Sequence, residues 1–134
     1  MLSMRRFLVA AAALAAVTAT ASPAATPRAA HGPLTGTWRG VLSNGSRNEH
    51  ITLTVNGRQT GGTWKVSASC QGKLTLESIS GGSHHFLRHL APGSTCAGGD
   101  IDCLWPQGTT VYDNVTPRAG GWDRNGTLHR VRVK

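Results

Sequence analysis

Acidic and aromatic residues are scarce in this sequence. The 134-residue chain has 6 Asp and Glu against 14 Lys and Arg, and only 1 Tyr and 2 Phe accompany its 4 Trp. It contains no Gly-x-Ser-x-Gly elbow, no His-Glu-x-x-His pair and no phosphate-binding loop. These are the motifs by which many serine hydrolases, zinc peptidases and nucleotide-binding enzymes are found in a sequence. We therefore expect a protein that is not an enzyme and needs no cofactor.

The chain also lacks an apolar run long enough to cross a bilayer as a helix. Phe7 to Val17 is apolar throughout, but it is too short for a hydrocarbon core of about 30 Å. Two arginines precede this run, and the small residues Ala19-Thr20-Ala21 follow it. This order predicts a secretory signal peptide over residues 1–21 and a flexible leader rich in Ala, Pro and Thr over residues 22–33. The expected location is extracellular or the cell envelope, with no transmembrane segment in the mature chain.

Only three cysteines are present, namely Cys70, Cys96 and Cys103. In an oxidising compartment two of them should pair and one should be left over, and the sequence alone allows all three pairings. Cleavage after Ala21 would leave 113 residues, which is enough for one domain and not two. We place that domain at residues 34–134.

Positive charge dominates what remains after the signal. Removing Arg5 and Arg6 leaves 12 Lys and Arg against 6 Asp and Glu, a net charge of +6. Such a charge favours an acidic partner, which could be a small molecule, a wall polymer or a protein. The basic residues are dispersed, and the alternating run Arg130 to Lys134 resembles one face of a strand, so we do not expect a nucleic-acid site. We expect a monomer.

No stretch after the leader has helical periodicity, and short alternating segments recur between glycine, asparagine and proline breaks. Eight candidate strands result: Gly36 to Leu42, Glu49 to Val55, Gly62 to Ser67, Lys73 to Ser80, Ser83 to Leu90, Asp100 to Trp105, Thr109 to Val115 and Gly126 to Val133. Asn56-Gly57 predicts a type I′ hairpin, and Gly81-Gly82 predicts another turn. The layout predicts an all-β fold, either a small antiparallel up-and-down barrel or a two-sheet sandwich.

Three stretches together carry a family resemblance. They are Gly36-Thr37-Trp38-Arg39-Gly40, Cys70-Gln71-Gly72-Lys73-Leu74-Thr75-Leu76 and Gly126-Thr127-Leu128-His129-Arg130. This order resembles a small secreted β domain of actinobacteria, found alone or as the extracellular part of some serine/threonine kinases. The resemblance implies a non-catalytic module with a Cys70–Cys96 bridge. The family usually has a glutamate where Arg88 stands here, which implies a different ligand.

The Gly36-x-Trp38 opening is also similar to the start of lipocalin and avidin barrels. In those barrels the tryptophan closes one end, and a distant arginine can pack over it. Arg130 is the candidate for that arginine here. The alternative is an ordinary core tryptophan in a first strand.

Two clusters of titratable residues are weak candidates for chemistry. His84, His85 and His89 alternate between strand faces, and their spacing fits no zinc pattern, so we expect no metal site. Asp100 and Asp102 share one face about 6.6 Å apart by strand rise, a distance compatible with acid/base catalysis. We interpret these two residues as a solvent-facing pair beside the basic strands.

Tryptophan is the more informative residue type. Trp38 and Trp64 lie in well-patterned strands and should be core. Trp105 and Trp122 lie at strand ends or in loops, where an indole often anchors a ligand. We predict a ligand site at the barrel mouth formed by Trp105, Trp122 and Arg88, with arginines at its rim.

The sequence therefore predicts a secreted, non-catalytic binding module that holds a small or acidic ligand. A protein-binding module such as a secreted protease inhibitor is the alternative, and it would use an exposed rigid loop over residues 91–99. A small hydrolytic enzyme comes third.

Overall fold

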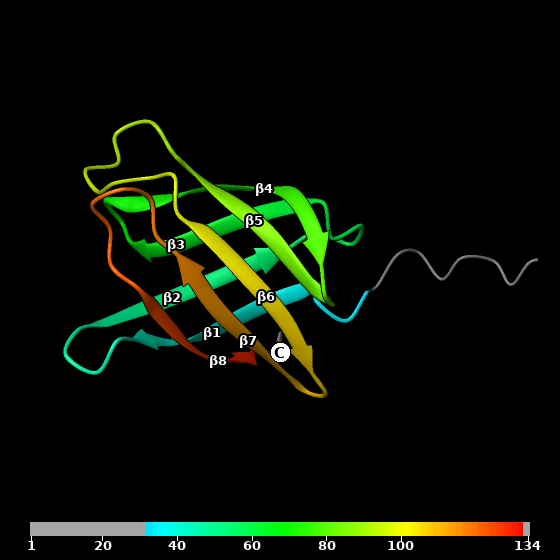
Figure 1. The fold of residues 1–134 in the computed structure, drawn as a ribbon. Helices are drawn as coiled ribbons and strands as arrows, with labels where there is room; N and C mark the ends of the chain where they lie inside the picture. Colours follow the sequence, from blue (N-terminus) through cyan, green and yellow to red (C-terminus); the bar gives the residue numbers. More distant parts are fainter. Residues whose placement is uncertain (1–31, 133–134) are drawn as a thin grey trace, which may run out of the picture.

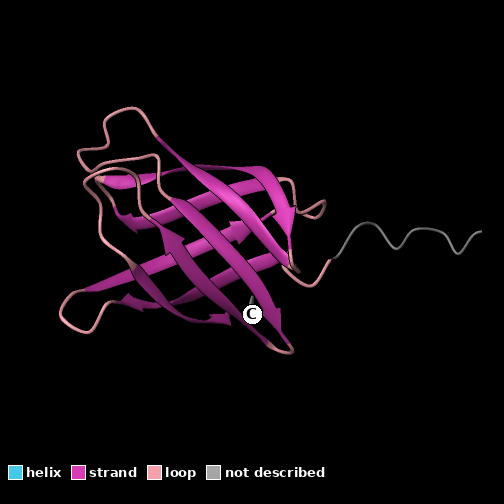
Figure 2. Cartoon of the chain, in the orientation of Figure 1, coloured by secondary structure: helices cyan, strands magenta, loops and turns pink. Residues whose placement is uncertain are grey.

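The computed structural model describes residues 32–132, so the predicted signal peptide, most of the predicted leader and the last two residues lie outside the described part. Eight strands connected by loops make up this part (Figure 2). They are β1 (Gly36–Ser43), β2 (Asn48–Val55), β3 (Gly61–Ser67), β4 (Cys70–Ser80), β5 (Ser83–Leu90), β6 (Ile101–Gln107), β7 (Thr110–Thr116) and β8 (Arg124–Arg130). Within residues 32–132, no helix has the length and apolar character that a membrane crossing requires.

The strands form one closed antiparallel barrel in which each strand pairs with its sequence neighbours (Figure 1). β1 pairs with β2 along its whole length and with β8 on its other edge, where Trp38 lies opposite Arg130. Within residues 32–132, each of the eight strands is paired on both sides, which protects the sheet from edge-to-edge pairing with another chain. The prediction of an all-β up-and-down fold with eight strands is confirmed, and the barrel is chosen over the sandwich. β8 lies earlier than expected, since it ends at Arg130.

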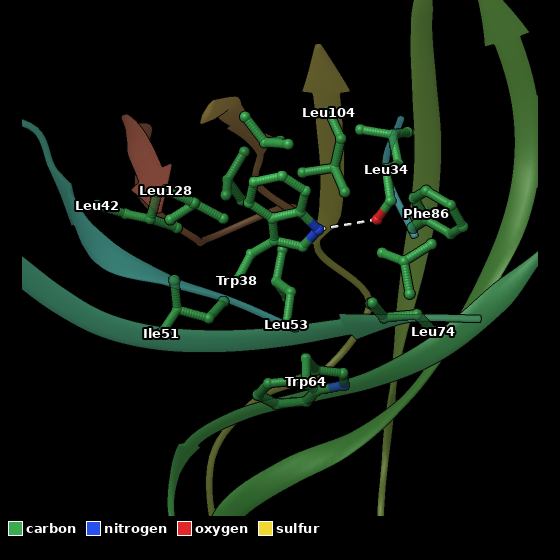
Figure 3. Close-up of a cluster of buried hydrophobic side chains, with 13 residues drawn as sticks. Leu34, Trp38, Leu42, Ile51, Leu53, Trp64, Leu74, Phe86, Leu104 and Leu128 are labelled. Carbon is green, nitrogen blue, oxygen red and sulfur yellow. Dashed lines mark hydrogen bonds between the residues drawn. The ribbon is translucent and has the colours of Figure 1, made fainter. Parts of the chain in front are cut away.

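The core follows from the alternation of apolar and polar residues along the strands. Every second side chain of a strand points inward, and these positions hold most of the large apolar residues. The buried cluster comprises Leu34, Trp38, Leu42, Ile51, Leu53, Val55, Trp64, Leu74, Phe86, Leu104, Val111, Val115 and Leu128 (Figure 3). Trp38 and Trp64 are each 1% exposed, which confirms both as core residues.

One end of the barrel is closed by the segment that precedes β1. Leu34 is fully buried there, and its carbonyl oxygen accepts a hydrogen bond of 2.8 Å from Trp38 Nε1 (Figure 3). The Arg130 guanidinium lies 4.4 Å from the centre of the Trp38 ring and donates to the Thr35 carbonyl at 2.8 Å. The predicted contact between Arg130 and Trp38 is therefore present. A cation over an indole face adds attraction to the packing of this end.

The two predicted turns have different outcomes. Gly81 and Gly82 both have positive φ, and Ser80 pairs with Ser83 across a two-residue turn, as a type I′ hairpin requires. The prediction of the same turn at Asn56-Gly57 is wrong. There the loop spans residues 56–60, and Gln59 takes the positive φ and donates its backbone N–H to the Asn56 carbonyl. The Asn56 side chain accepts from the Thr60 backbone, which favours the longer loop.

The structure contains the Cys70–Cys96 disulfide that the family resemblance implied. The bridge connects the start of β4 to the long loop between β5 and β6. Cys103 is the free cysteine, and it is buried on β6. Burial raises the pKa of the Cys103 thiol, which keeps it in its less reactive protonated form.

Removing the bridge should destabilise the barrel. The double variant Cys70→Ala/Cys96→Ala should lose about 3 kcal/mol of unfolding free energy, because the 26-residue separation closes a long loop in the unfolded chain. Denaturant unfolding should show the same loss for the parent protein under reducing conditions and no further loss for the variant. Equal stability of the parent with and without reductant would contradict the prediction.

Candidate functional site

The barrel end opposite Leu34 is hollow. Its surrounding loops are residues 44–47, 68–69, 91–100 and 117–123. They enclose a cavity of about 710 Å³, which is within the range of about 300–1,000 Å³ found for small-molecule sites. Its charged lining consists of four arginines and two acids, namely Arg47, Arg88, Arg118, Arg124, Glu49 and Asp100.

Arg88 forms the floor of this cavity from inside the barrel. It is 3% exposed, and its Nε and Nη2 atoms donate to the two carboxylate oxygens of Asp102 at 2.6 and 2.8 Å. Its Nη1 atom donates to Glu49 Oε1 at 3.2 Å, and its guanidinium lies 5.0 Å from the Trp64 ring centre. Although burial opposes the charge, the two acids raise the pKa of Arg88 above its ordinary value. Arg88 therefore remains a cation inside the barrel.

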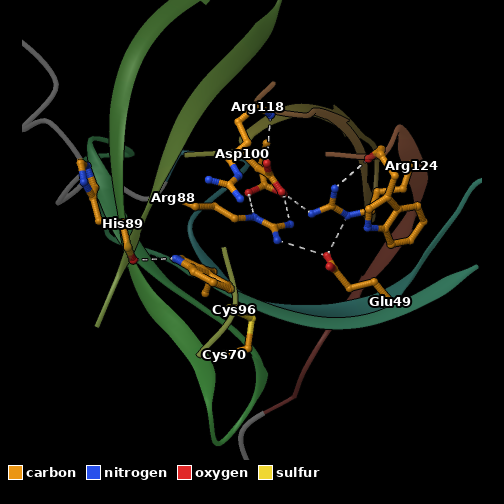
Figure 4. Close-up of polar contacts among 11 residues, drawn as sticks. Glu49, Cys70, Arg88, His89, Cys96, Asp100, Arg118 and Arg124 are labelled. Atoms are coloured by element: carbon orange, nitrogen blue, oxygen red, sulfur yellow. Dashed lines mark hydrogen bonds and ion pairs between the residues drawn. A yellow bond between two sulfur atoms is a disulfide. The ribbon is translucent and has the colours of Figure 1, made fainter. Parts of the chain in front are cut away.

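Arg124, at the start of β8, extends this network across the barrel (Figure 4). Its Nε atom donates to the same Glu49 oxygen at 3.1 Å, and its Nη2 atom donates to Asp100 Oδ2 at 2.7 Å. Asp100 also accepts the Arg118 backbone N–H at 3.0 Å. Each interior arginine thus joins two acids from different strands or loops, so the network holds the wall of the barrel together at this end.

The interpretation of Asp100 and Asp102 as a solvent-facing pair is wrong. Asp102 is fully buried and Asp100 is 8% exposed. Each accepts hydrogen bonds from an arginine guanidinium. Burial alone would penalise both carboxylates, and the ion pairs with Arg88 and Arg124 compensate for it.

A second acid, Asp113, lies beside Asp102 deep in the barrel. It is fully buried, and as a carboxylate it has no hydrogen-bond partner among the described residues. Burial and the neighbouring Asp102 charge raise the pKa of Asp113 well above its usual range. Burial also disfavours charge on Asp102, but Arg88 outweighs this effect and lowers the pKa of Asp102. The opposite pKa shifts of the two acids favour the proton on Asp113, which then donates a hydrogen bond to a carboxylate oxygen of Asp102.

Two further arginines stand at the rim of the cavity. Arg47 is exposed, and its guanidinium lies 4.5 Å from the centre of the Trp122 ring; Arg124 lies 4.8 Å from the same ring. The Arg118 side chain is also exposed. Within residues 32–132, the ion pairs all belong to Arg88 and Arg124. Arg47 and Arg118 therefore keep their guanidinium donors available to a ligand.

The structure brings two of the three predicted ligand-binding residues together. Arg88 and Trp122 both line the cavity, although Arg88 lies within the barrel and not at the rim. Trp105 lies toward the end of β6, at the opposite end of the barrel. There it packs against Tyr112 of β7, with ring centres 6.1 Å apart. The structure therefore does not place Trp105 with Trp122 at one mouth.

Sequence reasoning missed Glu49, Arg124 and Asp113. The sequence did contain a signal for these three residues. Each stands at a position that alternates in step with the buried residues of its strand and therefore points inward. Glu49 alternates in step with Ile51 and Leu53, both buried. A charged residue at an inward position needs a buried partner of opposite charge, so the inward charges could have been matched with one another.

The three histidines do not converge on one point. His84 stacks with Phe86 at 6.2 Å between ring centres, while exposed His89 lies 2.7 Å from the Thr75 hydroxyl. His85 lies opposite Cys103 on β6. No group of three or more His, Cys, Asp or Glu side chains in residues 32–132 is arranged to hold a metal ion.

No known protein family, no curated protein and no solved structure matches this chain.

Removing the Arg88 guanidinium should strongly destabilise the fold. Arg88→Met leaves Asp102 charged and buried without its bidentate partner, and we expect a loss of about 3–5 kcal/mol in unfolding free energy. Adding Asp102→Leu should recover a large part of this loss, because the pair is then replaced by apolar groups. Denaturant unfolding of both single variants and the double variant measures the coupling. Arg58→Met, at an exposed loop position, is the control and should change little.

Asp113 should make the stability depend on pH. Its pKa is raised in the folded state, so above the unfolded value of about 3.9 the folded chain keeps a proton that the unfolded chain has lost. The unfolding free energy should therefore fall as the pH rises toward the folded pKa of Asp113. For one proton, the steepest possible fall of the unfolding free energy is about 1.4 kcal/mol per pH unit.

Asp113→Asn should remove this fall, because the carboxamide donates to Asp102 without titrating. In denaturant unfolding, the unfolding free energy of the variant should rise relative to that of the parent protein as the pH increases above about 4. Asp102 acts in the opposite direction: its lowered pKa contributes stability that both proteins lose below about pH 4. Asp123→Asn, an exposed acid, should leave the profile unchanged. Parallel profiles of Asp113→Asn and the parent would contradict a protonated Asp113.

Proposed function

We propose that this chain is an exported, non-catalytic binding protein that holds a small anionic ligand in the cavity at the open barrel end. The observation that carries the proposal is the charge of the cavity lining, where four arginines face two acids. The two acids already accept hydrogen bonds from Arg88 and Arg124. The uncompensated positive charge comes from Arg47 and Arg118 at the rim.

The cavity offers a distinct surface for each part of such a ligand. Arg47 and Arg118 supply guanidinium donors for a carboxylate or phosphate. Trp122, which is half-buried, lines the cavity with indole surface against which an apolar part can pack. Glu49 uses Oε1 for both of its arginine contacts, so Oε2 can accept a hydroxyl or amine of the ligand.

The site is largely formed before any ligand binds. Arg88 and Arg124 are fixed by ion pairs, and the disulfide borders the same cavity. A site that is already ordered loses little conformational entropy on binding. The same ion pairs support binding over hydrolysis, because Asp100 and Asp102 are both engaged by guanidinium groups.

A protein partner bound through the loop of residues 91–100 is the second candidate function. The Cys70–Cys96 bridge anchors this loop. The Thr95 N–H donates to the Ser69 carbonyl in the β3–β4 turn at 2.8 Å, and the Ala91 N–H donates to the Gln71 carbonyl on β4 at 2.9 Å. Protease inhibitors need a binding loop held in this way. Such a partner would bind independently of Arg47.

The test begins with native and denaturing mass spectrometry of protein secreted by its own host. A small molecule retained natively and lost on denaturation would identify the ligand. In parallel, thermal-shift screening of mono- and dicarboxylates and sugar phosphates should find anions that raise the melting temperature. Arg47→Gln and Arg118→Gln should each lower the affinity for the most stabilising anion about tenfold, while Arg58→Gln should leave this affinity unchanged.

Two results would overturn the proposal. One is the absence of both a natively bound molecule and any stabilising anion. The other is an anion whose affinity is equally high in the parent, Arg47→Gln and Arg118→Gln.

A further inference from the structure

The barrel separates its acidic residues from its basic ones. Four of the six acids point into the barrel or its cavity, namely Glu49, Asp100, Asp102 and Asp113. The two exposed acids are Glu77 and Asp123. Of the ten Lys and Arg residues between positions 32 and 132, only Arg88 and Arg124 are buried. The outer surface therefore has eight basic residues against two acids, a ratio of four to one, whereas residues 32–132 as a whole have ten basic residues against six acids.

Part of this positive charge gathers on the outer face of β1 to β4, which form one continuous wall (Figure 1). Arg39 on β1 lies opposite Thr52 on β2, and Thr52 lies opposite Lys65 on β3. Lys73 on β4 lies one diagonal step from Lys65, since it pairs with Thr63. We call Arg39, Lys65 and Lys73, with the outward threonines between them, the basic wall.

The basic wall is grooved. A hollow of about 610 Å³ crosses β2 to β5 and includes Thr52, Thr63, Lys65, Lys73 and His89 in its lining. A second hollow of about 280 Å³ includes Arg39, Thr52 and Lys65. Because the hollows share Thr52 and Lys65, they form one track across the strands. Neither Glu77 nor Asp123 lines either hollow.

We propose that the basic wall binds a linear anionic polysaccharide that lies across the strands of β1 to β4. Arg39 and Lys65 are separated by two strand spacings, roughly 10 Å, so neighbouring acidic sugars of one chain can reach both. None of the described ion pairs uses Arg39, Lys65 or Lys73. Their charges are therefore free to pair with carboxylates.

The uncharged residues of the wall favour a polysaccharide over a nucleic acid. The outward positions between the cations hold hydroxyl and amide side chains, including Thr52, Thr54, Thr63 and Gln71, which can exchange hydrogen bonds with sugar hydroxyls. Sequence-tolerant binding of single-stranded nucleic acid uses aromatic side chains on which bases stack. In these four described strands, both tryptophans are buried in the core and there is no tyrosine or phenylalanine.

The cations of the basic wall are separate from the cavity at the barrel end, although the wall hollows border it at His50, Trp64 and Val66. Arg39, Lys65 and Lys73 do not line the cavity. A polysaccharide on the wall would leave the cavity open to its small ligand. The two binding events can therefore be tested separately.

The experiment measures binding of the purified protein to polygalacturonate, which has one carboxylate per sugar, at two salt concentrations. Lys65→Gln/Lys73→Gln should weaken binding about tenfold, because two of the three wall cations are lost. Arg58→Gln/Arg132→Gln removes the same charge from other exposed positions and should weaken it less than threefold. Raising the salt concentration should weaken polygalacturonate binding more for the parent protein than for either double variant.

The controls give each result a meaning. Neutral dextran should not bind, and single-stranded DNA should compete poorly with polygalacturonate. Arg47→Gln and Arg118→Gln should bind polygalacturonate with the affinity of the parent protein, even though their affinity for the small anion is lower. Absence of polygalacturonate binding, equal losses in the two double variants, or preference for DNA would each overturn the proposal.

Discussion

The bidentate ion pair between Arg88 and Asp102 is the interaction on which the open half of the barrel depends. An eight-stranded barrel has an interior that side chains can fill or that can hold one small ligand. At the closed half, apolar residues around Trp38 do so (Figure 3). At the other half, charged side chains line the cavity and occupy the interior beneath it, and each charge buried there requires a partner. Arg88 supplies that partner to Asp102 and Glu49 together.

The ion-paired interior also explains why the cavity is suited to binding. Arg124 and Asp100 continue the network to the loops, so the floor of the cavity is fixed by contacts between distant parts of the chain (Figure 4). The disulfide fixes the neighbouring loop. Arg47 and Arg118 are left with available donors at the rim, where an anion can reach them. The same placement of acids inside the barrel leaves the outside with excess positive charge.

The alternation of apolar residues allowed all eight strands to be predicted, because inward positions repeat every two residues. It did not predict which inward charges meet. Arg88 and Asp102 meet because β5 pairs with β6 in the register that places Phe86 opposite Asp102. Arg124 and Glu49, 75 positions apart, meet because β8 closes the barrel against β1. Trp105 and Trp122 were grouped because both lie near strand ends. Trp105 is near the end of β6 and Trp122 just precedes the start of β8, and these two positions lie at opposite ends of the barrel.

The sequence by itself therefore determined the strands, the turn at Gly81-Gly82 and which tryptophans are core, since these depend on local periodicity and local turn chemistry. At Asn56 even the local signal was insufficient, because a side-chain hydrogen bond to Thr60 favours a longer loop. Only the tertiary structure decided between a barrel and a sandwich. It also placed Asp102 and Asp113 side by side in the interior, and it put most acids inside the barrel and most basic residues outside. These outcomes depend on contacts between residues far apart in the chain, and no local pattern encodes such contacts.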